Sequence, residues 1–332
     1  MPFLQRARRQ GAEFLNPVPT AKGVENGMLP IIWKMLRGPE ERVPNPALAP
    51  FRTEAAACAG PAADLRVTWL GHSTVLLELD GRRILTDPMW ASYASPVPLG
   101  FGKRFFPVPL ALQDLPPLDL IVQSHDHYDH LDPATLRQLA RLQPTVPVLC
   151  PLRVGRYYAE AGWAPQLIHE LDWTDSFQVA DLTVTAVPAR HFSGRGITGQ
   201  NQTLWASYVL QGPRHRVFFG GDTGPFLAGH TEIGAAYGPF DLTMLEVGAY
   251  GEGWPDIHLG PENAIQAHQA LGGKVLLPIH WGTFNLAFHS WREPVEQVQE
   301  LAAAAGIPLL LPKPGVPTEV EPAGFISRWW ER

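Results

Sequence analysis

The sequence predicts an α/β protein in which helices cover two packed β-sheets. Alternating apolar runs, which are typical of strands, gather in a first cluster that begins near residue 65 and in a second that begins near residue 182. Between and after these clusters, short apolar runs alternate with segments that carry helix-start and helix-end signals. We find no sequence repeat at a fixed period.

The first cluster predicts a hairpin followed by a buried strand. Its three apolar runs are LRVTWLG (65–71), STVLLELDG (73–81) and GRRILTDP (81–88). Asp80 and Gly81 join the last two runs, and Asp-Gly at such a place is a strong hairpin signal. Residues 88–117 are rich in proline and predict a loop. The continuous apolar run at 118–124 predicts a strand that is buried on both faces.

The rest of the chain predicts a mixture of strands and helices. Strands are expected at 146–151, 182–190, 204–212, 215–222, 241–248 and 274–280. Helices are expected at 132–141, 153–162, 260–272 and 293–306. The helix at 132–141 has the clearest start, because Asp132 occupies the N-cap and Pro133 the first helical position.

Composition narrows the class of protein. The net charge of −6 lacks the basic excess of a general nucleic-acid binder, so no nucleic-acid partner is expected. The two cysteines, Cys58 and Cys150, cannot form a disulfide framework, which favours a reducing compartment. No early apolar stretch has the length of a signal peptide or a membrane span. We expect a cytoplasmic protein, either soluble or peripheral to the inner face of the membrane.

Residues 1–60 show no clear period and are interpreted as an N-terminal extension to a catalytic domain at residues 61–332. Within the extension, the segment MLPIIWKMLRG (28–38) predicts a short helix that packs on the main domain. Its mixture of Trp, Lys and Arg with Ile and Leu also suits a membrane-touching or dimer-forming element.

The motif HDHYDH is the strongest functional feature. It places His125, His127, Asp129 and His130 within six residues, directly after the predicted buried strand. Side chains at the carboxyl end of such a strand face a crevice where ligands bind. His125 and His127 project on one side, while Asp129 and His130 point to a neighbouring position. This spacing is typical of a site for two metal ions.

Three further side chains follow other predicted strands. His191, Asp222 and His280 each come after an apolar run and precede small or turn-forming residues. Any one of them alone is typical of an ordinary polar residue at a strand end. Together with the His-rich motif they complete the shells of two ions, since zinc takes about four N, S or O ligands.

These seven residues resemble the ligand set of the metallo-β-lactamase fold superfamily, and the resemblance covers residues 64–315. It implies a four-layer αββα sandwich with two Zn²⁺ ions along one edge; Mn²⁺ or Fe²⁺ stay open as alternatives. It assigns one ion to His125, His127 and His191, the other to Asp129, His130 and His280, and both to Asp222. A hydroxide that bridges the ions would be the nucleophile.

Longer segments resemble the N-acyl-phosphatidylethanolamine-hydrolysing phospholipase D family. They are TDPMWASYASPVPLGFGKRFFP (86–107), SHDHYDHLD (124–132), GDTG (221–224), GAYGEGWPDIHLGPENA (248–264) and IHWGTFNLA (279–287). This resemblance implies a metal-dependent phosphodiesterase that acts on a phospholipid or another small molecule. A homodimer and peripheral membrane contact are also expected from it.

Several residues gain roles from the resemblance. Asp129, Asp222 and His258 are expected to be catalytic, with His258 assisting the leaving group. Asp87 is expected to hydrogen-bond a metal-bound histidine. His72 is expected either to support the metal ligands from behind or to lie in the core. Residues expected to line the substrate pocket are Lys103, Arg104 and Tyr250, with Glu246 as a further candidate. Aromatic residues expected to help a lipid leave the bilayer are Trp90, Phe101, Phe105 and Phe106.

We also considered three other functions. A lactonase or other carbon-centred ester hydrolase would use the same metal site. A non-catalytic binding module would not need all seven ligand positions, which are present here. The acidic net charge argues against a nuclease.

Overall fold

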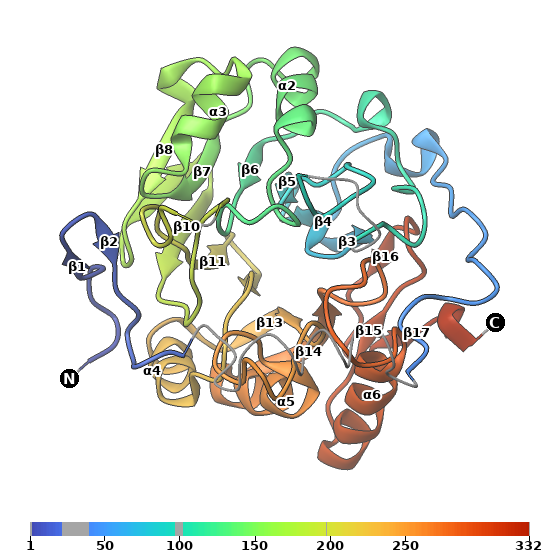
Figure 1. Cartoon of the computed structure of the whole chain (residues 1–332). Helices are drawn as coiled ribbons and strands as arrows, with labels where there is room; N and C mark the ends of the chain where they lie inside the picture. Colours follow the sequence, from blue (N-terminus) through green and yellow to red (C-terminus); the bar gives the residue numbers. More distant parts are fainter. Residues whose placement is uncertain (1, 22–39, 97–101, 197, 332) are drawn as a thin grey trace.

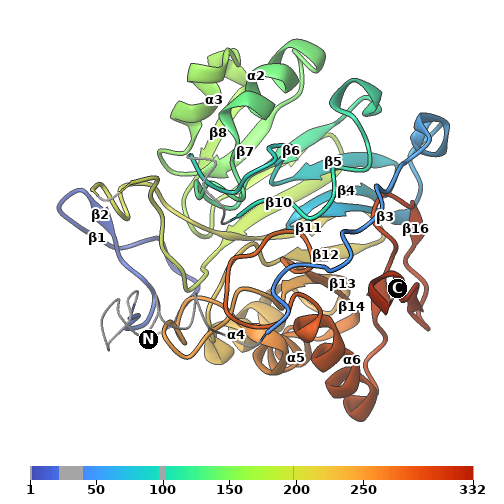
Figure 2. The same cartoon turned by 45° about the vertical axis from the view of Figure 1, so that its right-hand side comes forward.

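The computed structural model describes residues 2–21, 40–96, 102–196 and 198–331. Two β-sheets pack face to face, and helices cover the outer face of each (Figure 1). A view turned by 45° separates the four layers, with α2 and α3 on one side and α4, α5 and α6 on the other (Figure 2). The helices are α2 (Pro133–Leu142), α3 (Gly155–Ala161), α4 (Leu227–Tyr237), α5 (Gly260–Leu271) and α6 (Glu293–Ala305). The predicted four-layer sandwich is confirmed.

The first sheet has the strand order β16-β3-β4-β5-β6-β7-β8. Its strands are β3 (Leu65–Gly71), β4 (Thr74–Leu79), β5 (Arg82–Thr86), β6 (Leu120–Val122), β7 (Val148–Pro151), β8 (Ile168–Leu171) and β16 (Thr318–Glu319). Strands β3, β4 and β5 are antiparallel, and β5 to β8 are parallel. Asp80 and Gly81, with φ of 49° and 81°, form the predicted tight turn between β4 and β5.

The second sheet has the order β14-β13-β12-β11-β10-β9. Its strands are β9 (Ser176–Val179), β10 (Leu182–Val187), β11 (Ser207–Gln211), β12 (Arg216–Phe219), β13 (Phe240–Glu246) and β14 (Gly273–Ile279). Strands β9 to β12 are antiparallel, and β12 to β14 are parallel. Strands β10, β12, β13 and β14 therefore run in the same direction, and their carboxyl ends meet at one edge of the sandwich. Large buried side chains such as Trp69 and Tyr208 belong to the main core, and the hydroxyl of Tyr208 on β11 donates to Gln123 O, beside β6 of the other sheet, at 2.9 Å.

Some elements carried no clear sequence signal. Helix α4 contains Gly229 and Gly234 and no capping side chain, so its pattern did not predict a helix. The short strands β1 (Arg9–Gln10), β2 (Glu13–Phe14), β15 (Leu310–Leu311) and β17 (Phe325–Ile326) were also missed. Each has two residues, which is too few for a period to appear.

The N-terminal part that the structure describes is docked on the body of the protein. Phe14 is fully buried in the main core, and its backbone N–H donates to Asn201 O at 2.8 Å. The boundary at residue 60 stays a prediction, and the segment at 28–38 lies outside the described residues. Within the described ranges, no helix combines the length and the apolar content needed to cross a membrane.

Candidate metal centre

The seven predicted ligands come together at the edge where the strands end. The motif at 125–130 follows β6, and the other three side chains follow β10, β12 and β14. Gly221 permits the close approach of the two sheets there, because a Cβ on it would lie 2.5 Å from Ser124 Cβ. With its φ of 57°, this position favours glycine. Together with His72, these side chains form two largely buried clusters, which meet at Asp222.

The first cluster consists of His125, His127, His191 and Asp222. His125 Nε2 lies 2.8 Å from His127 Nδ1, and His191 Nε2 lies 3.2 Å from that same nitrogen. The ring of His125 is held by Ser124 Oγ at 2.9 Å from its Nδ1. Three imidazole nitrogens therefore converge on one point, as ligands of a single ion would.

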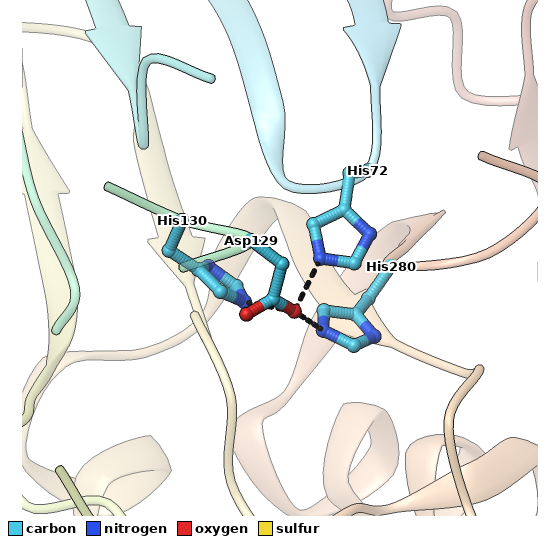
Figure 3. Close-up of side chains that lie close together, drawn as sticks. All are labelled: His72, Asp129, His130 and His280. Atoms are coloured by element: carbon cyan, nitrogen blue, oxygen red, sulfur yellow. Dashed lines mark hydrogen bonds and ion pairs between the residues drawn. The ribbon is translucent and has the colours of Figure 1, made fainter. Parts of the chain in front are cut away.

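The second cluster consists of His72, Asp129, His130 and His280 (Figure 3). Asp129 Oδ2 lies 2.9 Å from His72 Nε2, 3.3 Å from His280 Nε2 and 3.4 Å from His130 Nε2. His72 thus contacts the Asp129 carboxylate directly. The sequence had left open whether His72 supports the metal ligands or lies in the core. Burial and the neighbouring His280 lower the pKa of His72 to about 3, so its ring is neutral.

Asp222 lies between the two clusters. Its Oδ2 is 3.1 Å from both His130 Nε2 and His280 Nε2, and 3.7 Å from His191 Nε2. Apart from these ion pairs, neither carboxylate oxygen has a hydrogen-bond partner within the described residues, and the same holds for Nε2 of His130 and His280. Buried polar atoms without partners are costly. Their convergence fits a site whose partners are metal ions.

The charges of the site point the same way. Burial lowers the pKa of His280, but the carboxylates of Asp222 and Asp129 outweigh it and raise that pKa to about 10. The same balance raises the pKa of His130 well above its ordinary value. Burial raises the pKa of Asp222, yet His130 and His280 hold it well below its usual range. The ionised carboxylates thus need cations beside them, and divalent metal ions displace protons from such histidines.

Asp87 orients His130 of the second cluster through hydrogen bonds. Its Oδ2 accepts from His130 Nδ1 at 2.7 Å and from Ser124 Oγ at 2.6 Å. Its Oδ1 accepts from the backbone N–H of Ser124 at 2.7 Å and from Gln123 Nε2 at 3.0 Å. With Nδ1 occupied, the ring of His130 presents Nε2 to the cluster, which is how carboxylates commonly orient metal-binding histidines.

His258 lies at the rim and is paired with a buried carboxylate. Its Nδ1 is 2.6 Å from Glu246 Oε2 and 3.9 Å from Asp222 Oδ2. Glu246 is fully buried at the end of β13, and its Oε1 accepts from the backbone N–H groups of Thr223 and Leu259 at 2.6 and 3.3 Å. The carboxylate therefore fixes the ring of His258 and leaves Nε2 as its free nitrogen.

A set of contacts that the sequence did not predict joins the ligand loop to the loop after His191. The Asp126 carboxylate accepts from Gly194 N at 2.8 Å and from Thr203 Oγ1 at 2.9 Å. In return, Arg195 Nη1 donates to Asp126 O at 2.8 Å and Leu131 O at 2.7 Å. We call these contacts the loop clasp. Arg195 carried no sequence signal, because it acts on backbone atoms of a distant segment.

The predicted basic pair does not join the clusters. Lys103 is exposed. Arg104 is only 7% exposed, and its guanidinium donates to Met89 O at 2.6 Å and Ala91 O at 3.2 Å. It also stacks over Phe284 at 4.6 Å, and burial lowers its pKa to about 9. These contacts anchor the loop that follows β5.

The remaining pocket predictions have different outcomes. The hydroxyl of Tyr250 donates to Glu293 at 2.5 Å, and its ring stacks on His289, which lines a pocket beside His280. The expectation that Phe106 meets lipid is wrong, because this side chain is 2% exposed and packs against Phe51. Trp90 and Phe105 are partly buried, and Phe101 lies outside the described residues.

Comparisons with known proteins extend over most of the chain. The beta-lactamase superfamily domain matches residues 82–281. An uncharacterised protein of Mycobacterium tuberculosis is 49% identical over 276 residues, which cover 82% of this chain and 73% of that protein. The N-acyl-phosphatidylethanolamine-hydrolyzing phospholipase D 1 of Caenorhabditis elegans is 35% identical over 250 residues, which cover 72% of this chain and 70% of that protein.

The fold has solved counterparts. Igni18, a metallo hydrolase from the archaeon Ignicoccus hospitalis, matches with a TM-score of 0.59 at 24% identity. The match covers 76% of this chain and 97% of Igni18. The chain therefore belongs to the metallo-β-lactamase superfamily and is a metal-dependent hydrolase.

Proposed function

We propose that this hydrolase is a dinuclear zinc phosphodiesterase of the N-acyl-phosphatidylethanolamine phospholipase D type. The observation that carries the dinuclear site is the convergence of buried His and Asp side chains in two clusters that meet at Asp222, whose carboxylate oxygens have no hydrogen-bond partner within the described residues. The phosphodiesterase activity is supported by the similarity to the phospholipase D of Caenorhabditis elegans.

The donor set fits two zinc ions, because imidazole nitrogens and carboxylate oxygens are preferred zinc ligands. One ion would be held by His125, His127 and His191, the other by Asp129, His130 and His280, and Asp222 would serve both. When bound, zinc would supply the Lewis acidity that activates water and offsets charge on the phosphate. Mn²⁺ and Fe²⁺ accept the same donors and stay alternatives.

The protein's own groups would handle the leaving group. Hydrolysis adds water to phosphorus and breaks a P–O bond, so the departing oxygen needs a proton. His258 could supply that proton from Nε2, because its other ring nitrogen, Nδ1, is bound to Glu246 Oε2 at 2.6 Å. The buried Glu246 carboxylate would stabilise the positive charge on that ring until the proton is transferred.

The test is turnover of the zinc-loaded protein on three substrates: bis-p-nitrophenyl phosphate, an N-acyl phosphatidylethanolamine and a lactone. Asp222→Ala serves as the inactive control. Phosphodiester cleavage that this variant loses is the expected result. Lactone cleavage with both phosphodiesters inert would overturn the proposal and assign a carbon-centred ester hydrolase to the same metal site.

The proposal includes a phospholipid substrate that is met by peripheral contact at the inner face of a membrane, and a homodimer. Both follow from the resemblance to the phospholipase D family. Co-sedimentation with liposomes tests the first, and sedimentation velocity tests the second. Recovery of the protein in the supernatant at all lipid concentrations would refute the membrane contact.

A further inference from the structure

The position of His191 depends on contacts from two distant segments. Its ring is oriented by Ile257, whose backbone oxygen lies 2.8 Å from Nδ1. Its Nε2 then faces the first cluster, 3.2 Å from His127 Nδ1. His191 lies in the loop after β10, so a second contact must fix the backbone from which the ring projects.

Asn16 supplies that second contact. Its Nδ2 donates to His191 O at 2.6 Å, and its Oδ1 accepts from His191 N–H at 3.0 Å. One side-chain amide thus satisfies both backbone groups of a single residue, which fixes its position and its orientation. Asn16 is 175 residues away in the chain and is partly buried.

Asn16 is itself held on both sides by the docked segment that contains it, residues 3–21. Before it, Phe14 is fully buried and pairs with Asn201 O. After it, Pro19 O accepts from Arg190 Nη2 at 2.6 Å, and Ala21 N–H donates to Asp256 at 2.9 Å. Arg190 is also ion-paired with Asp256 at 2.8 Å. The segment therefore bridges the loop that carries His191 and the loop that precedes His258.

We propose that Asn16 is a positioning residue that fixes the backbone of His191 and thereby sets the metal affinity of the first cluster. The segment at 3–21 then contributes to metal binding by holding Asn16 in place. This inference rests on the proposed function, because it takes His191 as a zinc ligand. It does not depend on which ester the enzyme cleaves.

The test compares the full chain with Asn16→Ala and Asn16→Asp. Asn16→Asp keeps the shape of the side chain and the acceptor for His191 N–H, but removes the donor to His191 O. Glu13→Ala is the matched control, because Glu13 is exposed on the same segment. Zinc affinity is measured by competition with a chromophoric chelator, and Tm is measured for metal-free and zinc-loaded protein.

Both Asn16 variants are expected to bind zinc about 10- to 100-fold more weakly than wild type, as is usual when a group that orients a ligand is lost. The rise in Tm on adding zinc should shrink accordingly, while Glu13→Ala keeps it. Zinc binding within twofold of wild type in both variants would overturn the inference. A lower Tm without metal and an unchanged rise with zinc would do the same, since it shows a purely structural role.

The outcomes separate this inference from the proposed function. Asn16-dependent zinc binding in a protein that is inert on phosphodiesters would refute only the reaction. Wild-type protein that binds no zinc would refute both.

Discussion

The histidines of the metal centre and those of the helical layer are equally buried but differ in charge. His280 and His130 are at most 2% exposed, as are His230 on α4 and His268 on α5. Burial lowers the pKa of both His230 and His268 to about 4. Beside the carboxylates of the site, the pKa of His280 rises instead to about 10.

The difference shows what distinguishes the candidate ligands from other buried histidines. His230 Nδ1 has no hydrogen-bond partner within the described residues, as is also true of both ring nitrogens of His280. A partnerless histidine nitrogen is therefore not enough to indicate a metal. His230 packs near Phe218 and Phe226, whereas His280 faces two carboxylates, Asp129 and Asp222. The neighbouring carboxylates therefore distinguish the environment of His280 from that of His230.

The largest effect is expected from Asp222→Asn, which removes the charge that the two clusters share. Turnover should fall by about 10³-fold or more, because several kcal/mol of electrostatic stabilisation would be lost. Zinc content by mass spectrometry should fall with it. The control is Asp181→Asn, an exposed aspartate that pairs with Arg82. Wild-type zinc content in the Asp222 variant would contradict the shared role.

The next effect is expected from His258→Ala, which should lower turnover by about 10²- to 10⁴-fold, the usual range for a lost general acid. Zinc content should stay at the wild-type level, because the proposal assigns His258 to the leaving group. Glu246→Gln should have a smaller effect on kcat, since it leaves the ring of His258 in place and removes only the negative charge beside it.

A substrate with a better leaving group sharpens this test. Such a substrate needs less protonation, so it should lose less activity in His258→Ala than a poor one. An equal loss on both substrates, or a loss of zinc, would show that His258 acts in some other way.

A third prediction concerns the loop clasp. Arg195→Ala removes the donor to Asp126 O and Leu131 O, and zinc affinity should fall about tenfold as the ligand loop loosens. Arg214→Ala, an exposed arginine that pairs with Asp64, is the control. Chelator competition gives the affinities. An Arg195 variant that holds zinc as tightly as wild type would limit the clasp to folding.

The sequence predicted which side chains gather at the candidate site better than it predicted the contacts that hold them there. His191, Asp222 and His280 could be found because each follows an apolar strand run and belongs to a chemically coherent set. Asn16 and Arg195 could not, because both act through backbone atoms of segments that only the fold brings near. Local sequence records the type of a side chain, but not which distant backbone it contacts.

The same limit applied to the fold. The hairpin at Asp80 and Gly81 was predictable, because the turn residues themselves impose its geometry. Helix α4 was not, because its Gly234 is accommodated by close packing against α5, where a Cβ would come within 2.2 Å of Ala270 O. Here the tertiary contact, rather than helix propensity, determines the residue.

The last prediction concerns the stability of the folded protein and the buried histidine His230. The pKa of His230 is about 4 in the folded protein and near 6.5 when unfolded, so the unfolded chain binds more protons between these values. Stability is therefore fully present above pH 6.5 and is lost as the pH falls toward 4, by up to about 3 kcal/mol for this group. His230→Leu should remove that part of the loss.

Urea unfolding of the metal-free protein at pH 7 and pH 4.5 measures the difference, with Thr231→Ala on the exposed face of α4 as the control. The leucine variant should lose less stability on acidification than either wild type or the control. An identical acid loss in all three proteins would mean that His230 stays protonated in the folded state. Burial without a neighbouring carboxylate would then not suffice to keep this histidine neutral. The contrast in pKa between His230 and His280 would no longer hold.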